Sequence, residues 1–148
     1  MKKSVSVLLM AVALAGCGEP QDTRPGQPVA HRRSAFKEIL RVYEPMGVML
    51  RDDEYDAKKF KAAADKLLTL RETPWEYFAP DTLYPPSHAK AEVWSEAAKF
   101  AAARKAFIDA TDKLAAVAGP STDRQRVQAA YDAVEEACSD CHKAFKTR

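Results

Sequence analysis

The sequence predicts an all-α protein with the architecture of an antiparallel up-down four-helix bundle. Four stretches repeat apolar residues at steps of three and four, which is the period of one helix face. No stretch alternates as a strand would, and most connections between the helical stretches are short. The chain has 148 residues, of which 47% are hydrophobic and 30% charged, enough for a single core. We therefore expect one domain, over residues 29–148.

The first sixteen residues are expected to be an export signal rather than part of that domain. They begin with the basic MKK and continue with an apolar stretch over residues 5–14, which is too short to span a bilayer. The stretch ends in LAGC, which resembles the lipobox of bacterial lipoproteins, and this resemblance implies that Cys17 carries a lipid. Gly18, in place of an aspartate, favours the outer membrane. An ordinary signal peptide with an incidental cysteine is the alternative.

Residues 17–28 are expected to form a lipidated, flexible tether on the periplasmic side of a bacterial membrane. Residues 18–28 contain three prolines, two glycines and no large apolar side chain, which is the composition of a linker. Removal of residues 1–16 takes away Lys2 and Lys3, so 23 basic residues become 21, against 21 acidic ones. This balance lacks the basic signature of a nucleic-acid-binding protein, and we expect no such partner.

The first helix is predicted over residues 29–49, where apolar residues return every three or four positions. Pro45 lies inside this pattern and is expected to kink or locally break the helix, because proline removes a backbone donor. Met46 and Met49 lie on the apolar stripe and are expected to fill the core.

The second helix is predicted to begin with Asp56 as its N-cap, with Tyr55 and Phe60 in a hydrophobic staple, and to continue to Leu70. Residues 71–86 hold four prolines and show no period. We therefore expect a long loop whose aromatic side chains cover an apolar surface.

The third and fourth helices are separated by a glycine and a proline. The third is predicted from near Ser87 to a stop at Gly119. The fourth begins after the sequence STD, residues 121–123, which offers three N-caps, and its apolar stripe continues to Phe145.

The apolar face of the fourth helix carries the sequence CSDCH, residues 138–142. At about 100° per residue, Cys138, Cys141 and His142 span an arc of about 100°, so one planar ligand can contact all three. This is the pattern of a c-type haem, in which the two thiols bond to vinyl groups and the imidazole coordinates the iron. A disulfide oxidoreductase would place the thiols at a helix N-terminus, a disulfide between these helix positions has poor geometry, and a zinc site lacks a second ligand pair.

The chain resembles the cytochrome c′ family, the class II c-type cytochromes, over about residues 29–146. The resemblance is carried by the C-terminal placement of CSDCH and by the sequences HRRSAF, TPWEYFAPDT, AEVWSEAAKF and CHKAF. It implies a four-helix bundle with one covalently bound haem c. Members of this family often form dimers through the first two helices, so a homodimer is among the expected partners.

The side chain opposite His142 decides whether a sixth ligand binds the iron. In an up-down bundle the level of His142 corresponds to residues 32–39 in the first helix, where no inward side chain readily ligates iron. The resemblance implies the same, because it aligns Phe36 with the distal position, which is methionine in the low-spin branch of the family. Met46 lies about 15 Å further along the helix.

The resemblance also implies roles for three basic residues. Arg32 is expected to meet the haem propionates, and Arg33 to contact the haem. Lys146 stands on the proximal side where the family usually has an arginine, so the charge is kept but the planar group is lost. A solvated helix start and a helix C-terminus are the structural alternatives for these residues.

We therefore expect a five-coordinate, high-spin haem protein that transfers electrons to a redox partner protein or binds small gases such as NO and CO. No acid-base pair or nucleophile is evident, so we expect no enzymatic activity. One alternative is a six-coordinate, low-spin electron carrier in which a residue such as His31 binds the iron. Another is a haem-free helical lipoprotein in which CSDCH has no function. His88 is expected at the surface or at the haem edge.

Overall fold

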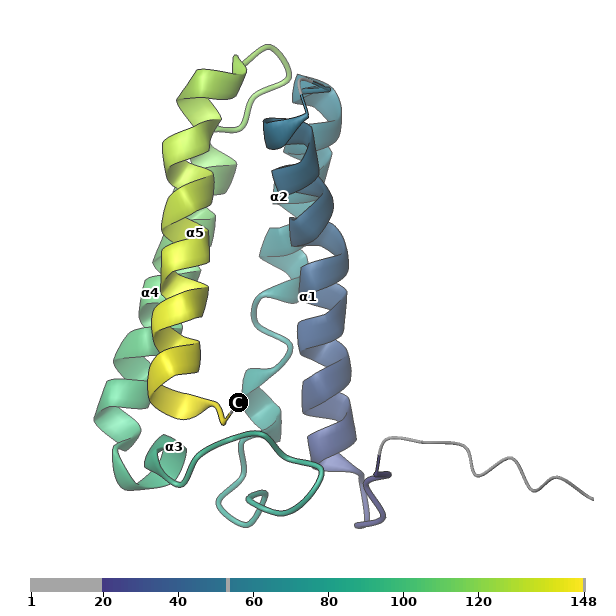
Figure 1. The fold of residues 1–148 in the computed structure, drawn as a ribbon, viewed down its shortest axis with the longest axis vertical. Helices are drawn as coiled ribbons and strands as arrows, with labels where there is room; N and C mark the ends of the chain where they lie inside the picture. Colours follow the sequence, from purple (N-terminus) through teal and green to yellow (C-terminus); the bar gives the residue numbers. More distant parts are fainter. Residues whose placement is uncertain (1–19, 53, 148) are drawn as a thin grey trace, which may run out of the picture.

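The computed structural model describes residues 20–52 and 54–147, which form a bundle of four long helices (Figure 1). The long helices are α1 (Pro28–Arg51), α2 (Ala57–Leu70), α4 (Ala97–Val117) and α5 (Arg124–Phe145), and the short ones are the 3₁₀ helix η1 (Trp75–Tyr77) and α3 (Glu92–Ser95). Successive long helices run in opposite directions along the bundle. The predicted up-down four-helix bundle is confirmed.

The predicted signal and Cys17 lie outside the described residues, so the lipid attachment stays a prediction. Among residues 20–52 and 54–147, no helix is both long enough and apolar enough to cross a membrane.

Helix α1 continues through Pro45, so the expected local break is wrong. Pro45 leaves the carbonyl of Arg41 without its helical donor. Both residues are exposed, so water can bond that carbonyl, and the helical backbone continues past Pro45 to Arg51.

Helix α2 begins as predicted. The Asp56 carboxylate accepts hydrogen bonds from the amides of Lys58 and Lys59 at 2.9 and 3.1 Å. The rings of Tyr55 and Phe60 lie 5.5 Å apart across the helix start, which confirms the hydrophobic staple.

The third predicted helix starts later than expected and is interrupted. Residues 87–91 are not helical, α3 spans four residues from Glu92, and a break at Glu96 separates it from α4. Backbone groups of residues 88–90 pair instead with the last residue of α5 and the chain after it. The Lys90 amide donates to the Phe145 carbonyl at 2.9 Å, and the amide of Thr147 donates to the carbonyl of His88 at 2.8 Å. These long-range bonds take the place of helical ones.

The core runs the length of the bundle between the four long helices. Met46, Phe60, Leu114, Val127 and Val134 are fully buried there, and burial of each such side chain contributes about 1.5–3 kcal/mol. The expectation that Met46 fills the core is confirmed, and Met49 packs against the same cluster.

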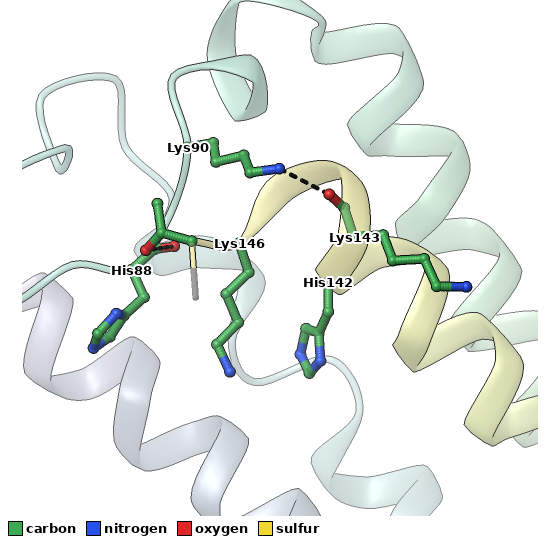
Figure 2. Close-up of a pocket in the computed structure, with 6 residues that line it drawn as sticks. His88, Lys90, His142, Lys143 and Lys146 are labelled. Carbon is green, nitrogen blue, oxygen red and sulfur yellow. Dashed lines mark hydrogen bonds between the residues drawn. The ribbon is translucent and has the colours of Figure 1, made fainter.

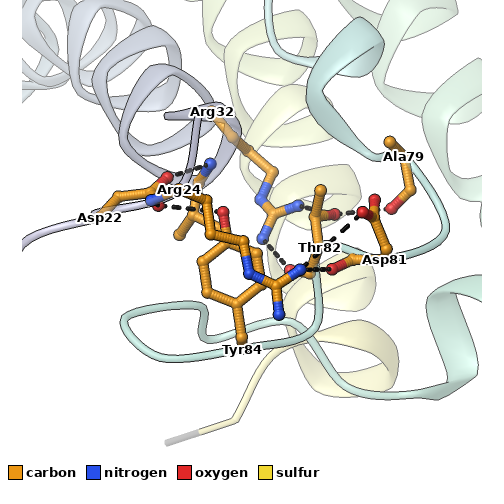
Figure 3. Close-up of polar contacts among 8 residues, drawn as sticks. Asp22, Arg24, Arg32, Ala79, Asp81, Thr82 and Tyr84 are labelled. Carbon is orange, nitrogen blue, oxygen red and sulfur yellow. Dashed lines mark hydrogen bonds and ion pairs between the residues drawn. The ribbon is translucent and has the colours of Figure 1, made fainter. Parts of the chain in front are cut away.

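Residues 20–27, which we expected to belong to a tether, contact the bundle (Figure 3). The buried carboxylate of Asp22 accepts from two amides in the first turn of α1, at 2.9 and 3.1 Å, and from the Tyr84 hydroxyl at 2.9 Å. The Arg24 guanidinium lies 3.8 Å from the centre of the Tyr84 ring and donates to the Asp81 carbonyl. The start of α1 is therefore fastened to the loop that precedes α3.

Candidate functional site

Cys138 and Cys141 are free, half-buried thiols within one turn of α5. Both line a cavity of about 350 Å³ between the helices. Burial raises the pKa of Cys138 to about 11 and also raises the pKa of Cys141, so both are protonated at neutral pH. A reactive redox pair would present a thiolate, so the oxidoreductase alternative is disfavoured.

His142 extends from the last turn of α5 and lines the same cavity as the two thiols. Figure 2 shows its imidazole beside the Lys146 side chain at the end of the bundle. Partial desolvation, and then the nearby ammonium of Lys146, lower the pKa of His142. The imidazole is therefore neutral at pH 7 and has an electron pair available for a metal.

The remainder of the cavity wall comes from α1, α3, α4, α5 and the segment between α2 and α3, and aromatic side chains form much of it. Its aromatic side chains are Phe36, Trp75, Phe78, Phe100, Phe107 and Phe145. No aspartate or glutamate within the described part of the chain lines this cavity. The apolar part of this wall suits a flat apolar ligand.

These features fit a covalently bound haem. Two neutral thiols and a neutral imidazole from one helix open into an apolar cavity, which is the donor set that such a group requires. The described residues contain no cluster of three or more histidine, cysteine or acidic side chains that could hold a bare metal ion.

Phe36 lies on the α1 side of the cavity and is held by two rings of the loop. Its ring meets Trp75 edge to face at 5.7 Å between centroids and Phe78 at 6.3 Å. The Trp75 indole is itself fixed, because its Nε1 donates to the Arg71 carbonyl at 2.6 Å. Phe36 is therefore a positioned side chain rather than a mobile one.

Arg32 also lines the cavity, but its guanidinium is bound to the loop (Figure 3). Only 4% of the residue is exposed. Nη1 donates to the Tyr77 carbonyl and to the Thr82 hydroxyl, both at 3.0 Å. Nη2 donates to the Thr82 carbonyl at 3.2 Å and to the Ser87 hydroxyl at 2.8 Å, and the guanidinium lies 4.4 Å from the centre of the Phe78 ring. Its observed role is to hold the loop, and its contact with a haem propionate stays a prediction.

The other predicted site residues are divided between the cavity and the surface. Arg33 and Lys146 line the cavity, as does His88. His31 does not: it is exposed and stacks on Tyr77, with ring centroids 5.3 Å apart. The structure therefore gives no support to His31 as a ligand.

Several cavity residues were not identified individually from the sequence. Trp75 and Phe78 belong to the loop whose aromatic side chains were expected to cover an apolar surface. That expectation did not say which surface they cover. Lys37 and Phe100 lie on helix faces with ordinary amphipathic patterns. Their place in the site depends on how the helices pack.

The fold and the site together define a c-type haem protein of the four-helix-bundle class. The family model described as Cytochrome C′ matches residues 27–146. The chain belongs to the cytochrome c′ family, and its cofactor is one covalently bound haem c.

Individual relatives match this chain over all or nearly all of their own length. Cytochrome c′ of Rubrivivax gelatinosus is 35% identical over 130 residues, which are 86% of this chain and 100% of the relative. The crystal structure of the R. gelatinosus protein matches with a TM-score of 0.77 at 33% identity, covering 86% of this chain and 100% of that one. A ferrous variant of cytochrome c′ from Alcaligenes xylosoxidans with bound NO also matches with a TM-score of 0.77 at 33% identity, covering 85% and 98%.

Proposed function

We propose that Cys138 and Cys141 attach the haem, that His142 is its axial ligand, and that the iron is five-coordinate and high-spin. The bound haem supplies an iron that can exchange one electron and bind a small neutral gas. The two neutral thiols and the neutral imidazole, which line one cavity from one helix, support this assignment.

The α1 wall of the cavity is the observation that carries the five-coordinate assignment. Its apolar side chains are Phe36, Ile39 and Leu40, and none of them can donate an electron pair to iron. Phe36 is held by two loop rings, so a diatomic ligand has to compete with its ring for space. The NO complex of the A. xylosoxidans relative supports gas binding by this chain.

The test is the visible absorption spectrum of the haem-loaded mature protein, oxidised and then reduced, with and without carbon monoxide. We expect a broad high-spin spectrum that shifts when carbon monoxide is added. Sharp low-spin bands that do not move with carbon monoxide would overturn the five-coordinate assignment. A protein without a haem band would overturn the attachment sites as well.

His88 is the residue on which a six-coordinate alternative now rests. It lines the cavity, whereas His31 is stacked on Tyr77 outside it. Figure 2 shows His88 and His142 at the same end of the bundle, around one opening, rather than on facing walls. We expect His88→Ala to leave the spectrum of the haem-loaded protein unchanged. A change from low-spin to high-spin bands in this variant would identify His88 as a sixth ligand.

We further propose that the protein faces the periplasm and is anchored through a lipid on Cys17, with the outer membrane favoured. The composition of residues 1–17 supports this. The wild type is expected in the membrane fraction, and Cys17→Ser is expected to release a haem-loaded protein into the soluble fraction. Equal amounts of both proteins in the membrane fraction would contradict the anchor.

The proposed activity is electron exchange with a redox partner protein and gas binding, rather than turnover of a substrate.

A second copy of the chain is a further proposed partner, because Leu40 and Val48 on α1 are large apolar side chains that are 44% and 43% exposed. Sedimentation velocity should show a dimer that Val48→Glu dissociates. A wild type that sediments as a monomer at all concentrations would contradict it.

A further inference from the structure

A second, open cavity lies at the end of the bundle where α5 finishes. It has a volume of about 790 Å³ and is lined by His88, Lys90, His142, Lys143, Lys146 and Thr147, which we call the basic bay (Figure 2). His88, His142 and Lys146 line both the basic bay and the apolar cavity. The basic bay therefore adjoins the proposed haem site.

The charged side chains that line the two cavities are all basic. The chain from Cys17 onward is balanced, with 21 basic and 21 acidic residues. Within the described residues, the two cavities are lined by six lysines and arginines and by no acidic residue; the six are Arg32, Arg33, Lys37, Lys90, Lys143 and Lys146. Three of the six, Lys90, Lys143 and Lys146, line the basic bay, which makes this opening positive.

The three lysines of the basic bay differ in the contacts that their ammonium groups make. Lys90 donates from Nζ to the Lys143 carbonyl at 2.8 Å, which fixes its ammonium at the end of α5. Lys143 forms a 2.9 Å ion pair with Asp140, but both side chains are largely exposed, so the pair is weak and can exchange partners. Lys146 forms no ion pair within the part of the chain that the structure describes.

The shape of the surface favours a protein over a lipid. A bilayer presents a broad and nearly flat anionic surface, whereas the positive charges here line a concave opening. An acidic projection of a protein can enter such an opening and bring several carboxylates against the lysines.

We infer that the basic bay is the docking surface for an acidic protein that acts as a one-electron carrier. The electron-transfer part of this inference rests on the proposed function. One electron crosses the interface, so the carrier loses the electron that the haem protein gains, and no bond is made or broken. Opposite charges on the two surfaces would accelerate their encounter and orient the carrier toward His142.

The test measures binding of fluorescein-labelled poly-L-glutamate to the haem-loaded protein by fluorescence anisotropy over a series of salt concentrations. The test variant is Lys90→Glu/Lys143→Glu, since both residues line the basic bay but not the apolar cavity. The control is Lys58→Glu/Lys113→Glu, which makes the same charge change at exposed positions near the start of α2 and the end of α4, at the opposite end of the bundle (Figure 1).

We expect poly-L-glutamate to bind the wild type and the control with similar affinity and the test variant about tenfold more weakly at low salt. Equal weakening in both variants, or no binding by the wild type, would overturn the docking surface. Binding of the wild type to phosphatidylglycerol vesicles without binding to poly-L-glutamate would overturn it in favour of a lipid surface. Visible spectra with carbon monoxide, recorded for all three proteins, test the proposed function separately.

Discussion

Phe36 meets Trp75 edge to face, with ring centroids 5.7 Å apart, so a loop residue fixes the side chain that closes the α1 side of the cavity. The size of the proposed gas site therefore depends on how α1 packs against the segment between α2 and α3. Because aromatic pairs of this kind contribute about 0.5–1.5 kcal/mol each, displacement of the Phe36 ring by a ligand carries a measurable cost.

We expect Phe36→Ala to accelerate carbon monoxide binding to the reduced haem protein. Removal of the ring abolishes the contacts with Trp75 and Phe78 that a ligand would have to break, which corresponds to about a tenfold higher association rate. Stopped-flow absorbance measures this rate directly. Val117→Ala, at an exposed position at the end of α4, is the control and should bind at the wild-type rate. An unchanged rate in Phe36→Ala would show that the ring does not limit access.

Arg32→Met should destabilise the protein by about 2–4 kcal/mol, because it removes the donors that hold the loop. Thr82 and Ser87, together with the Tyr77 carbonyl, would lose a buried hydrogen-bond donor. Urea denaturation of the haem-loaded protein measures the change in the free energy of unfolding. Arg126→Met is the control at an exposed position and should change stability by less than about 0.5 kcal/mol. A similar loss in both variants would contradict a special role for Arg32.

Asp22 should make stability depend on pH in the acid range. Burial alone would raise the pKa of Asp22, but hydrogen bonds from the Ala30 and Arg24 amides, the Tyr84 hydroxyl and the Val29 amide together lower it below its ordinary value of 3.8. A carboxylate with a lowered pKa in the folded state stabilises the protein fully above its unfolded pKa and loses this contribution as the pH falls through the folded pKa.

The measurement is the free energy of unfolding of the wild type and of Asp22→Asn between pH 2 and pH 7. The wild type should be more stable at pH 7, and the difference should shrink as the pH falls below the ordinary aspartate value. A difference that stays constant over the whole range would mean that the charge of Asp22 does not contribute.

The two cysteines should attach the haem independently. Each single variant, Cys138→Ala or Cys141→Ala, is expected to keep one covalent bond to the haem, and the double variant is expected to yield a haem that acid-acetone extracts. Extraction followed by absorbance of the organic phase separates these cases. A coloured organic phase from the wild type would contradict covalent attachment at these positions, and a folded, colourless wild type would indicate the haem-free alternative.

The sequence was most informative where local chemistry decides the structure. The apolar period predicted the four long helices, and Asp56 marked the start of α2 because its carboxylate caps the helix by itself. The thiols and the imidazole could be assigned to one face of α5 because their spacing alone fixes their angular positions.

The sequence was less informative where residues far apart in the chain decide the structure. Residues 88–90 bond to residues 145–147, so the third helix begins later than its own sequence indicates. The hydrogen bonds of Arg32 to a loop 45–55 positions further along the chain were not predicted, because no local pattern connects the two segments. Asp22 lies in a segment with the composition of a linker. Nothing in the neighbouring sequence indicates that its carboxylate accepts hydrogen bonds from both α1 and Tyr84.

Gly47→Ala should destabilise the protein, although alanine favours a helix over glycine by about 1 kcal/mol. A Cβ atom at this buried position would overlap the Tyr131 hydroxyl and lie 3.1 Å from Cζ of the same ring. The ring cannot move aside easily, because it stacks on Tyr43 at 4.4 Å between centroids and the Tyr43 hydroxyl donates to the Tyr131 carbonyl at 2.9 Å. Overpacking of this kind costs about 1–3 kcal/mol and outweighs the helix propensity.

Urea denaturation should therefore show a lower free energy of unfolding for Gly47→Ala. The double variant Gly47→Ala/Tyr131→Phe, which lacks the hydroxyl, should recover part of the loss. A more stable Gly47→Ala would show that the stacked pair yields to the added methyl group.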